Sequence, residues 1–462
     1  MSRTNSAPPA ARMTTHEGGT AVLIRPTEDL LRACASTMLF ESTFYEGGES
    51  IANRIAALVK ENTPERVAEV ALICKNDLHL RHVPLWLAVQ MSIAFRGNPI
   101  VRQTLAAVVQ RPDELAEVVS LYFKATGDDR KAKGHSRLPA QLKKGLAEAF
   151  GRFNEYSLAK WNRQDRAVKL RDVLFLTHPK AKDEEQDALW KRLVAGTLAT
   201  PDTWEVALSG GADKKETWER LMRERKLGGM ATLMNLRNMT EAQVERSVVR
   251  DALGWIDARS RLLPFRFVSA YKNAPEYADA LSEAMLRAVK GIGRLPGLTA
   301  LVVDVSGSMD GALSARSKMT RLDAAGALAV LVREICDDAR VFAYGTGWAE
   351  IPNLRGLPLV SVFADAQKKI GGGTQTKAAL LHTKTVVPNP DRVILITDEQ
   401  AEDGMIPSWG KDNGFVVNVA PYAPGLDTSG KWTRINGWSE RVLDWISYAE
   451  TGKPLTGEGD ED

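Results

Sequence analysis

Oxygen-bearing side chains gather at the end of one apolar run in the last third of the chain. Asp304, Ser306 and Ser308 follow the run 301–303 at alternate positions, which places one carboxylate and two hydroxyls close together. These ligands suit a hard cation of the magnesium type, which takes few carboxylates and keeps positions open for water. A short apolar run of this kind is typical of a buried parallel strand that displays polar residues beyond its carboxyl end.

Two later stretches could complete a cation site. Thr374 follows three glycines, and Asp398 follows a second apolar run at 393–397. Because central strands of a doubly wound sheet end at one edge, we expect Asp304 and Asp398 to face each other there. Two close carboxylates repel, and a divalent cation removes that repulsion. Thr376 is a rival for Thr374, and two structural aspartates held by hydrogen bonds are the alternative to a metal site.

A second group of candidate residues is basic and lies earlier in the chain. Residues 130–180 contain 13 Lys and Arg residues but only 4 Asp and Glu residues. Residues 1–300 contain 45 Lys and Arg and 36 Asp and Glu, so this short window accounts for the whole basic excess of the first 300 residues. Residues 301–462 are acidic, with 16 against 22. Basic side chains neutralise phosphates, and aromatic rings stack on unpaired bases. The candidates for RNA contact are Lys160, Arg163, Arg166, Lys169 and Arg171, which cluster before a predicted helix end at His178.

These basic residues also have a purely structural interpretation. If residues 160–169 are helical, the first four candidates stand at three-residue steps and each neighbouring pair shares a face. Such a face could follow a phosphate backbone or could simply be solvated. His178 could cap a helix or lie in the core, and the neighbouring Trp161 and Tyr156 could pack instead of stacking on bases.

The elements that must position these residues differ along the chain. Helical patterns with short breaks run up to about residue 289, which predicts stacked helix pairs in an irregular α-solenoid. After residue 298 strands alternate with helices, as in a doubly wound α/β sheet. Strands are predicted at 299–303, 340–343, 359–362, 392–397 and 415–419, and helices at 322–336, 366–369, 377–386 and 438–448.

Composition sets the limits of the interpretation. The 462 residues are 44% apolar and 26% charged, which fits a globular protein of two or three domains. We expect a disordered N-terminus over 1–20, a helical domain over 21–297, an α/β domain over 298–450 and an acidic tail over 451–462. Three scattered cysteines favour buried thiols in a reducing compartment. With no signal-peptide pattern and no apolar run of spanning length, the expected location is cytoplasmic.

Taken in order, the motifs resemble those of the Ro autoantigen family, in a bacterial or phage version. Asp304-x-Ser306-x-Ser308 with Thr374 and Asp398 resembles the metal-ion-dependent adhesion site of the von Willebrand factor A fold. The segments 40–48, 80–87, 169–178, 229–239 and 263–267 resemble the TROVE module of that family. The resemblance therefore covers nearly the whole chain, from about residue 25 to residue 450.

The resemblance implies an α-helical HEAT-like solenoid that closes into a ring, followed by an α/β doubly wound von Willebrand factor A domain. It implies a non-enzymatic protein of RNA quality control or RNA processing, with His178 near the RNA-binding surface. Small noncoding Y-like RNAs would bind a basic outer surface, and single-stranded ends of misfolded or structured RNAs would enter the cavity. Ser306, Ser308 and Thr374 would coordinate one divalent cation, Mg²⁺, directly, and the aspartates directly or through water. An exoribonuclease could work alongside a monomer, and neither DNA nor a membrane is an expected partner.

Two other functions stay open. A protein-interaction module would use the helices as scaffold and capture a partner's carboxylate through the metal. A metal-dependent hydrolase would need a general base, and none is evident near the candidate ligands. The sequence contains no Gly-Lys-Ser/Thr phosphate loop and no His-Glu-x-x-His motif. Gly291-x-Gly293 precedes a predicted strand instead of following one, so it fails the test for a dinucleotide loop.

Overall fold

The computed structural model describes most of the chain and divides it into two compact units. The described residues are 13–14, 20–21, 26–35, 48–127, 138–290, 292–313, 319–399, 404–409, 413–419, 426, 432–436 and 439–451. The first unit holds Met1–Glu49, Gly228–Glu241 and Glu245–Asp462, and the second holds Ser50–Leu227 and Ala242–Val244. The predicted disordered N-terminus and acidic tail lie largely outside the described residues. Within the former, β1 (Met13–Thr14) pairs with β2 (Thr20–Ala21).

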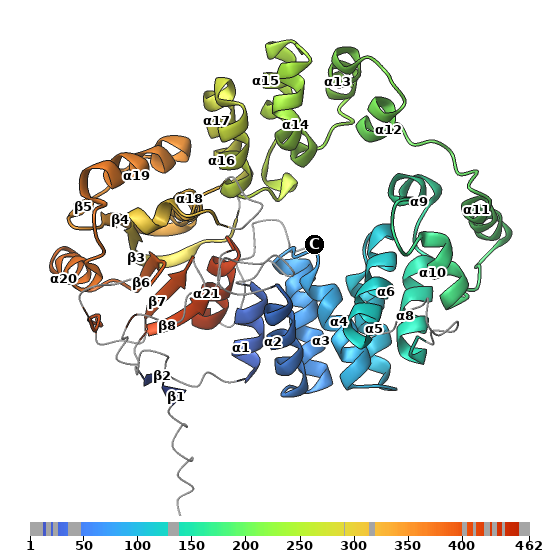
Figure 1. The fold of residues 1–462 in the computed structure, drawn as a ribbon, viewed down its shortest axis with the longest axis horizontal. Coiled ribbons are helices and arrows are strands. Elements are labelled where there is room, and N and C mark those ends of the chain that lie inside the picture. Colours follow the sequence, from blue (N-terminus) through green and yellow to red (C-terminus); the bar gives the residue numbers. More distant parts are fainter. Residues whose placement is uncertain are drawn as a thin grey trace, which may run out of the picture. The chain divides into compact units, whose positions relative to one another are not determined.

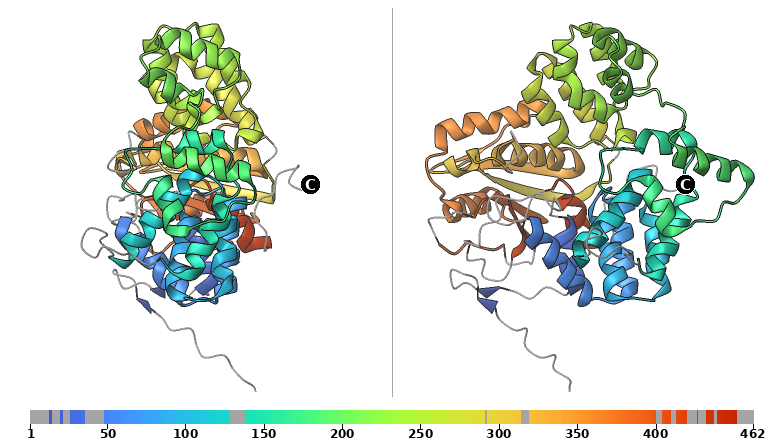
Figure 2. Two further views of the ribbon diagram at one scale, coloured as in Figure 1. Left: turned by 90° about the vertical axis from the view of Figure 1, so that its right-hand side faces the viewer. Right: turned by 45° about the vertical axis from the view of Figure 1, so that its right-hand side comes forward.

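The second unit is helical. Its helices are α2 (Gly48–Lys60), α3 (Pro64–Leu72), α4 (Val83–Ala94), α5 (Pro99–Val108), α6 (Pro112–Thr126), α8 (Ala140–Phe150), α9 (Glu155–Trp161), α10 (Leu170–Thr177), α11 (Glu184–Ala195), α12 (Trp204–Ser209) and α13 (Lys214–Arg223), with a π-helical turn at Ile73–Asp77. Helix α3 packs on α4 and α5, α4 packs on α6, and α8 packs on α5 and α10. Helices α3 to α10 therefore stack side by side, as Figure 1 and Figure 2 show and as the sequence predicts.

Local sequence signals place the ends of these helices and the distance between them. The Thr63 side chain caps α3, with Pro64 in its first turn, and the Asn98 side chain caps α5. Helices α5 and α8 approach unusually closely, because a Cβ atom at Gly145 would lie 2.7 Å from the Cβ of Leu105. Only glycine at position 145 lets the two backbones come this near without displacement.

The first unit is built on a six-stranded sheet of order β5-β4-β3-β6-β7-β8. Its strands are β3 (Leu295–Asp304), β4 (Cys336–Tyr344), β5 (Trp348–Glu350), β6 (Arg392–Thr397), β7 (Gly414–Asn418) and β8 (Trp432–Asn436). All neighbours pair in parallel except β5, which runs antiparallel to β4. The strand order changes direction between β3 and β6, so these two strands flank the crevice at which sheets of this kind bind ligands.

Helices complete the first unit. They are α1 (Pro26–Ala35), α14 (Gly229–Glu241), α15 (Arg246–Gly254), α16 (Pro264–Asn273), α17 (Ala278–Val289), α18 (Arg321–Ile335), α19 (Gly356–Ile370), α20 (Thr376–Val386) and α21 (Val442–Thr451), with 3-10 turns at Ala258–Ser260, Pro275–Tyr277 and Gly307–Asp310. On one face Val302 and Leu395 join Leu380 of α20 in the main core cluster. On the opposite face Phe415 packs edge-on against Trp445 of α21, with ring centroids 6.2 Å apart. Helix α18 contacts β3 and β4, and α19 contacts α17 (Figure 1).

Most of the predicted elements of this unit are present, and one strand assignment is wrong. Residues 359–362, predicted as a strand, and 366–369, predicted as a separate short helix, both belong to α19. Leu359, Phe363 and Ala366 are buried at helical spacing, so the apolar run follows a period of 3.6 residues. The short edge strand β5 and the last strand β8 are not predicted from the sequence.

The cysteines and the lengths of the helices can also be compared with the sequence analysis. Cys34, Cys74 and Cys336 are all buried, as the sequence predicts. Among the described helices, none combines the length and apolar character needed to cross a membrane.

Candidate functional site

The two aspartates of the predicted cation site meet at one edge of the sheet. Asp304 is the last residue of β3, and Asp398 directly follows β6. The two strands are parallel neighbours, with Val303 opposite Ile396. Both carboxylates are 0% exposed. Two buried acids at adjacent strand ends demand compensation by hydrogen bonds or positive charge.

Hydrogen bonds fix the Asp304 carboxylate. Its Oδ1 accepts from the backbone N–H of Ser306 at 2.8 Å, and its Oδ2 accepts from the Thr397 hydroxyl at 2.9 Å. Burial raises the pKa of Asp304 to about 6, and the nearby negative charge of Asp398 adds to this, while the bonds from Ser306 and Thr397 oppose it. The carboxylate is thus oriented but poorly compensated for negative charge, which is a reason for a cation to bind beside it.

The hydroxyl groups come from two loops in direct contact. Ser306 Oγ lies 3.0 Å from Ser308 Oγ in the first loop. The second loop begins at Gly371, where a Cβ atom would lie 2.5 Å from the carbonyl oxygen of Val305. This close approach places the loop that carries the buried Thr374 beside the Asp304 loop. In addition, the Gln367 side chain of α19 donates to the Ser306 carbonyl at 3.1 Å.

Thr376, the rival of Thr374, is engaged elsewhere. Its hydroxyl is fully buried and donates to the Tyr344 hydroxyl at 3.1 Å. Thr374 has no hydrogen-bonded partner for its hydroxyl among the described residues, although it is only 5% exposed. The geometry therefore favours Thr374 as the threonine available to a ligand.

The structure adds a residue that the sequence interpretation missed. Arg321 is the first residue of α18 and is 5% exposed. Its Nη1 donates to Asp398 Oδ2 at 3.0 Å and to the Ser308 carbonyl at 3.1 Å. The start of α18 lies beside the end of the Ser308 loop, since the N–H of Arg321 donates to the Gly311 carbonyl. A basic residue in the first turn opposes the helix dipole, and this is the one local signal that could have drawn notice to it.

The donor set fits a hard divalent cation. Two carboxylates and three hydroxyls supply oxygen ligands only, and within the described parts of the chain no group of three or more His, Cys, Asp or Glu side chains is placed to hold a metal. Mg²⁺ typically binds through one or two carboxylates and keeps several waters. In this structure Arg321 balances the negative charge of Asp398, one of the two carboxylates of the candidate site.

The basic candidates lie around the connection between α9 and α10. Helix α9 ends at Trp161, and residues 162–169 are not helical, so the three-residue steps from Lys160 to Lys169 do not form one helix face. Lys160, Arg163 and Arg166 are exposed, whereas Lys169 is half-buried at the start of α10. Arg163 forms a two-bond ion pair with Asp165, at 3.1 and 2.9 Å.

One face of α10 does gather groups that suit RNA. Arg171 and Phe175 are both exposed and stand four residues apart, which places them on the same side of α10. His178, also exposed, directly follows the last residue of the helix. His178 ends the helix in a left-handed conformation with φ of 49°, so it caps the helix and still faces solvent. Phe175 is 56% exposed. An aromatic ring between basic side chains offers both base stacking and phosphate contact.

Phe175 was missed from the sequence although a signal existed. It stands four residues after Arg171 and three before His178 in a stretch that is predicted to be helical. The aromatic residues that were selected differ in availability. Tyr156 is 55% exposed. Trp161 is half-buried, and the Arg111 guanidinium carbon lies 4.1 Å from its ring centroid, so one face of the ring is covered.

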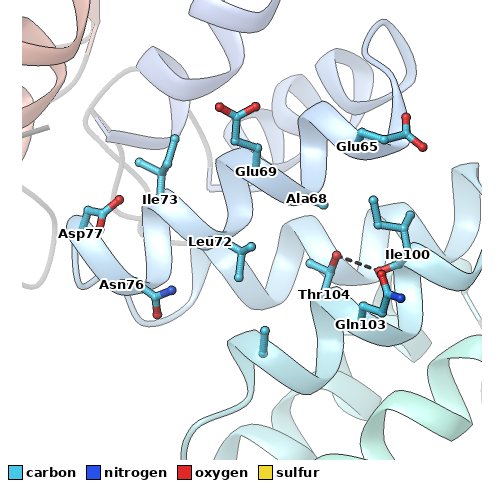
Figure 3. Close-up of a pocket in the computed structure, with 11 residues that line it drawn as sticks. Glu65, Ala68, Glu69, Leu72, Ile73, Asn76, Asp77, Ile100, Gln103 and Thr104 are labelled. Atoms are coloured by element: carbon cyan, nitrogen blue, oxygen red, sulfur yellow. Dashed lines mark hydrogen bonds between the residues drawn. The ribbon is translucent and has the colours of Figure 1, made fainter. Parts of the chain in front are cut away.

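The second unit also contains an apolar groove with acidic side chains at its edges, in contrast to the basic side chains around α9 and α10 (Figure 3). It lies between α3 and α5 and has a volume of about 540 Å³. Apolar residues such as Leu72 and Ile100 line it, and the carboxylates of Glu65, Glu69 and Asp77 stand at its edges. Negative charge at the rim would repel phosphate, so this groove is a poor candidate for RNA.

Comparisons with known proteins place the chain in a family. The model of the TROVE domain matches residues 30–196 and 187–291. Telomerase protein component 1 of Mus musculus is 25% identical over 48% of this chain, and its Rattus norvegicus counterpart is 29% identical over 23%. The matched parts are only 11% and 4% of those two proteins. The crystal structure of the Ro (RSR) protein of Deinococcus radiodurans shares the fold, with a TM-score of 0.63 and 17% identity over 93% of this chain and 100% of that one.

Proposed function

Because the chain belongs to the TROVE domain family as a Ro-type protein similar to the bacterial form, we propose that it binds RNA and is not an enzyme. The observation that carries the proposal is the exposed face of α10, which lies inside the matched region. Arg171 and Phe175 share one side of that helix, and His178 follows at its carboxyl end. A cation, an aromatic ring and an imidazole in this arrangement can contact a phosphate and an unpaired base at the same time.

The proposed ligands are small noncoding Y-like RNAs and single-stranded RNA ends. Y-like RNA would contact the exposed basic side chains around the α9–α10 connection. The helical solenoid would close into a ring, and the cavity of that ring would admit the ends of misfolded RNAs. This assignment makes RNA quality control or processing the role of the protein, with an exoribonuclease as a further partner. The availability of the basic side chains supports it. Of the five basic candidates and His178, only Arg163 forms an ion pair with another described residue.

We further propose that the sheet unit is of the von Willebrand factor A type and binds one Mg²⁺. Ser306, Ser308 and Thr374 would hold the ion together with Asp304 and Asp398, directly or through water. When bound, the ion would supply an open coordination position for an oxygen ligand such as a carboxylate. The protein's own residues do the rest: Thr397 and the Ser306 amide orient Asp304, and Gly371 keeps the two loops in contact.

Filter binding across a salt series tests the RNA proposal. A Y-like stem-loop RNA and a single-stranded RNA of equal length are titrated with protein between about 50 and 200 mM salt, the range over which phosphate contacts weaken strongly. We expect the logarithm of the binding constant to fall linearly with the logarithm of the salt concentration. Absence of binding at the lowest salt concentration would refute the proposal.

The alternative is a protein-interaction module in which the helices are scaffold only. It predicts that the basic residues are used up by acidic neighbours inside the fold. Lys160, Arg166 and Arg171 instead stay exposed and form no ion pair with any described residue. Binding of a protein partner that requires Mg²⁺, together with no RNA binding at low salt, would favour the alternative.

A further inference from the structure

We propose that Arg321 is a tethered counter-cation that competes with a divalent cation for Asp398. The inference rests on the proposed metal site and goes beyond it, because it assigns a regulatory role to a residue outside the metal-binding motif. The site would exist in two states, one balanced by the guanidinium and one balanced by the metal ion. Arg321 would set how tightly the metal binds.

The contacts of Arg321 place its charge within the candidate ligand set. One guanidinium nitrogen bridges Asp398 Oδ2 at 3.0 Å and the Ser308 carbonyl at 3.1 Å. The side chains of Arg321 and Asp398 are 6% and 0% exposed, so the ion pair is shielded from water. A Cβ atom at Gly311 would lie 3.0 Å from the guanidinium carbon, which shows that the turn fits closely around this group.

Electrostatics makes the two cations mutually exclusive at this carboxylate. A buried acid without a partner is costly, and the guanidinium removes that cost for Asp398 when no metal is bound. A divalent ion coordinated by Asp398 would stand close to the guanidinium, and repulsion between like charges is strong in a poorly hydrated site. Metal binding therefore requires Arg321 to leave Asp398, and the metal must replace the ion pair that is lost.

The position of Arg321 makes release of the side chain feasible. It lies at the first position of α18, where the backbone is held independently of the guanidinium. Thr320 and Asp323 form a capping box, in which each side chain accepts a hydrogen bond from the other residue's backbone N–H. Lys272 of α16 also pairs with Asp323. The helix start would therefore stay in place while the long arginine side chain moves.

Metal titration of Arg321→Gln tests the proposal. The probe is Mn²⁺ alone. Its binding is measured by isothermal titration calorimetry and by the loss of the free-ion signal in electron paramagnetic resonance. We expect Mn²⁺ to bind the variant at least roughly tenfold more tightly than the unchanged protein, because no ion pair has to be broken. In thermal melts with EDTA, Arg321→Gln should unfold at a lower temperature, and Mn²⁺ should raise its midpoint by more than it raises that of the unchanged protein.

Arg333→Gln is the matched control, since Arg333 lies on the same helix and bonds only the carbonyls of Ala339 and Pro352 among the described residues. It should leave Mn²⁺ affinity unchanged. Arg321→Lys keeps the charge but cannot reproduce the planar donor group, so it should bind Mn²⁺ with intermediate affinity even if the glutamine variant fails to fold. Equal or weaker affinity in the folded variants overturns the role of Arg321 alone. Absence of Mn²⁺ binding in the unchanged protein and in every variant overturns the metal site as well.

Discussion

Single side chains decide what the two candidate sites can do. Phe175 exposes a ring on α10, with Arg171 on the same side of the helix and His178 directly after its end. Because Phe175 is 56% exposed, its ring is accessible to a ligand. A base stacked on this ring would bring its phosphate within reach of the neighbouring basic side chain.

Phe175→Ala should weaken binding of single-stranded RNA by about 1–3 kcal/mol, the usual contribution of one stacked base. The dependence of RNA affinity on salt concentration should not change in Phe175→Ala, because stacking releases no counterions. Arg171→Gln should instead make this dependence less steep, by the amount expected for about one lost phosphate contact. Filter binding at several salt concentrations measures both. Met234→Ala is the control, since Met234 is also a large exposed apolar residue, at 71%. Equal losses for Phe175→Ala and Met234→Ala would argue against stacking.

Some residues of the candidate sites could be predicted from the sequence, and others could not. Asp304 and Asp398 could be paired from the sequence because each ends an apolar run and adjacent strands end together. Arg321 could not, since its contact with Asp398 spans 77 positions and depends on how a turn returns the chain to α18. Phe175 reads like any apolar residue of a helix until its neighbours leave it uncovered.

Helices and strands could be predicted from the sequence where apolar residues recur at a clear helical or strand spacing. The strand predicted at 392–397 matches β6, and the one predicted at 299–303 covers most of the buried part of β3, which begins four residues earlier at Leu295. The run Leu359-Val-Ser-Val-Phe363 has strand-like composition, and only its burial pattern reveals a helix. Between Lys160 and Lys169 the three-residue spacing of charges resembled a helix, but α9 ends at Trp161 and the next helix begins at Leu170.

Helix packing in the second unit gives a prediction at the scale of elements. Gly145→Ala should destabilise the protein by roughly 1–3 kcal/mol, since its methyl group would press on Leu105 and on the carbonyl of Arg102. Gly151→Ala, at the end of the same helix, meets nothing closer than 3.6 Å and should change the stability little. Urea unfolding of both variants measures the difference, and equal unfolding midpoints would contradict the close packing of α5 and α8.

At the scale of the whole molecule, the compact units do not coincide with the change in secondary structure. The predicted boundary at residue 297 marks the change from helices to strands, yet α14 to α17 group with the sheet. Partly buried hydrogen bonds join distant segments of this unit. Glu440 Oε1 accepts from the backbone N–H of Phe265, at the start of α16, at 2.8 Å, and Arg32 of α1 donates to the carbonyl of Arg434. No local pattern announces such contacts, because each depends on the final path of the chain.

Glu440 should make stability depend on pH. Burial raises its pKa from 4.5 to about 7, against the opposing bond from Phe265 and the charges of Arg441 and Arg266. A raised carboxyl pKa means that the stabilising contribution is complete below about pH 4.5 and is lost as the pH rises through about 7. The loss should reach at most about 3 kcal/mol.

Glu440→Gln isolates this effect, because glutamine keeps the acceptor for the Phe265 N–H and never ionises. Its unfolding midpoint in urea should approach that of the unchanged protein at pH 5 and exceed it at pH 8. Asp304 and other titrating groups are present in both proteins, so they cancel in the comparison. A difference that does not vary between pH 5 and pH 8 would show that Glu440 does not titrate in this range.

Helix α19 gives the sheet edge a mechanical connection to the helices behind it. At one end, Gly371 and Gln367 touch the loop of Val305 and Ser306. At the other end, the N–H of Leu357 donates to the Ser282 hydroxyl of α17 at 3.1 Å. A helix of 15 residues is stiff over its length. One helix therefore contacts both the loop of Val305 and Ser306 and helix α17, so the position of the candidate cation site is tied to the helices that pack behind the sheet.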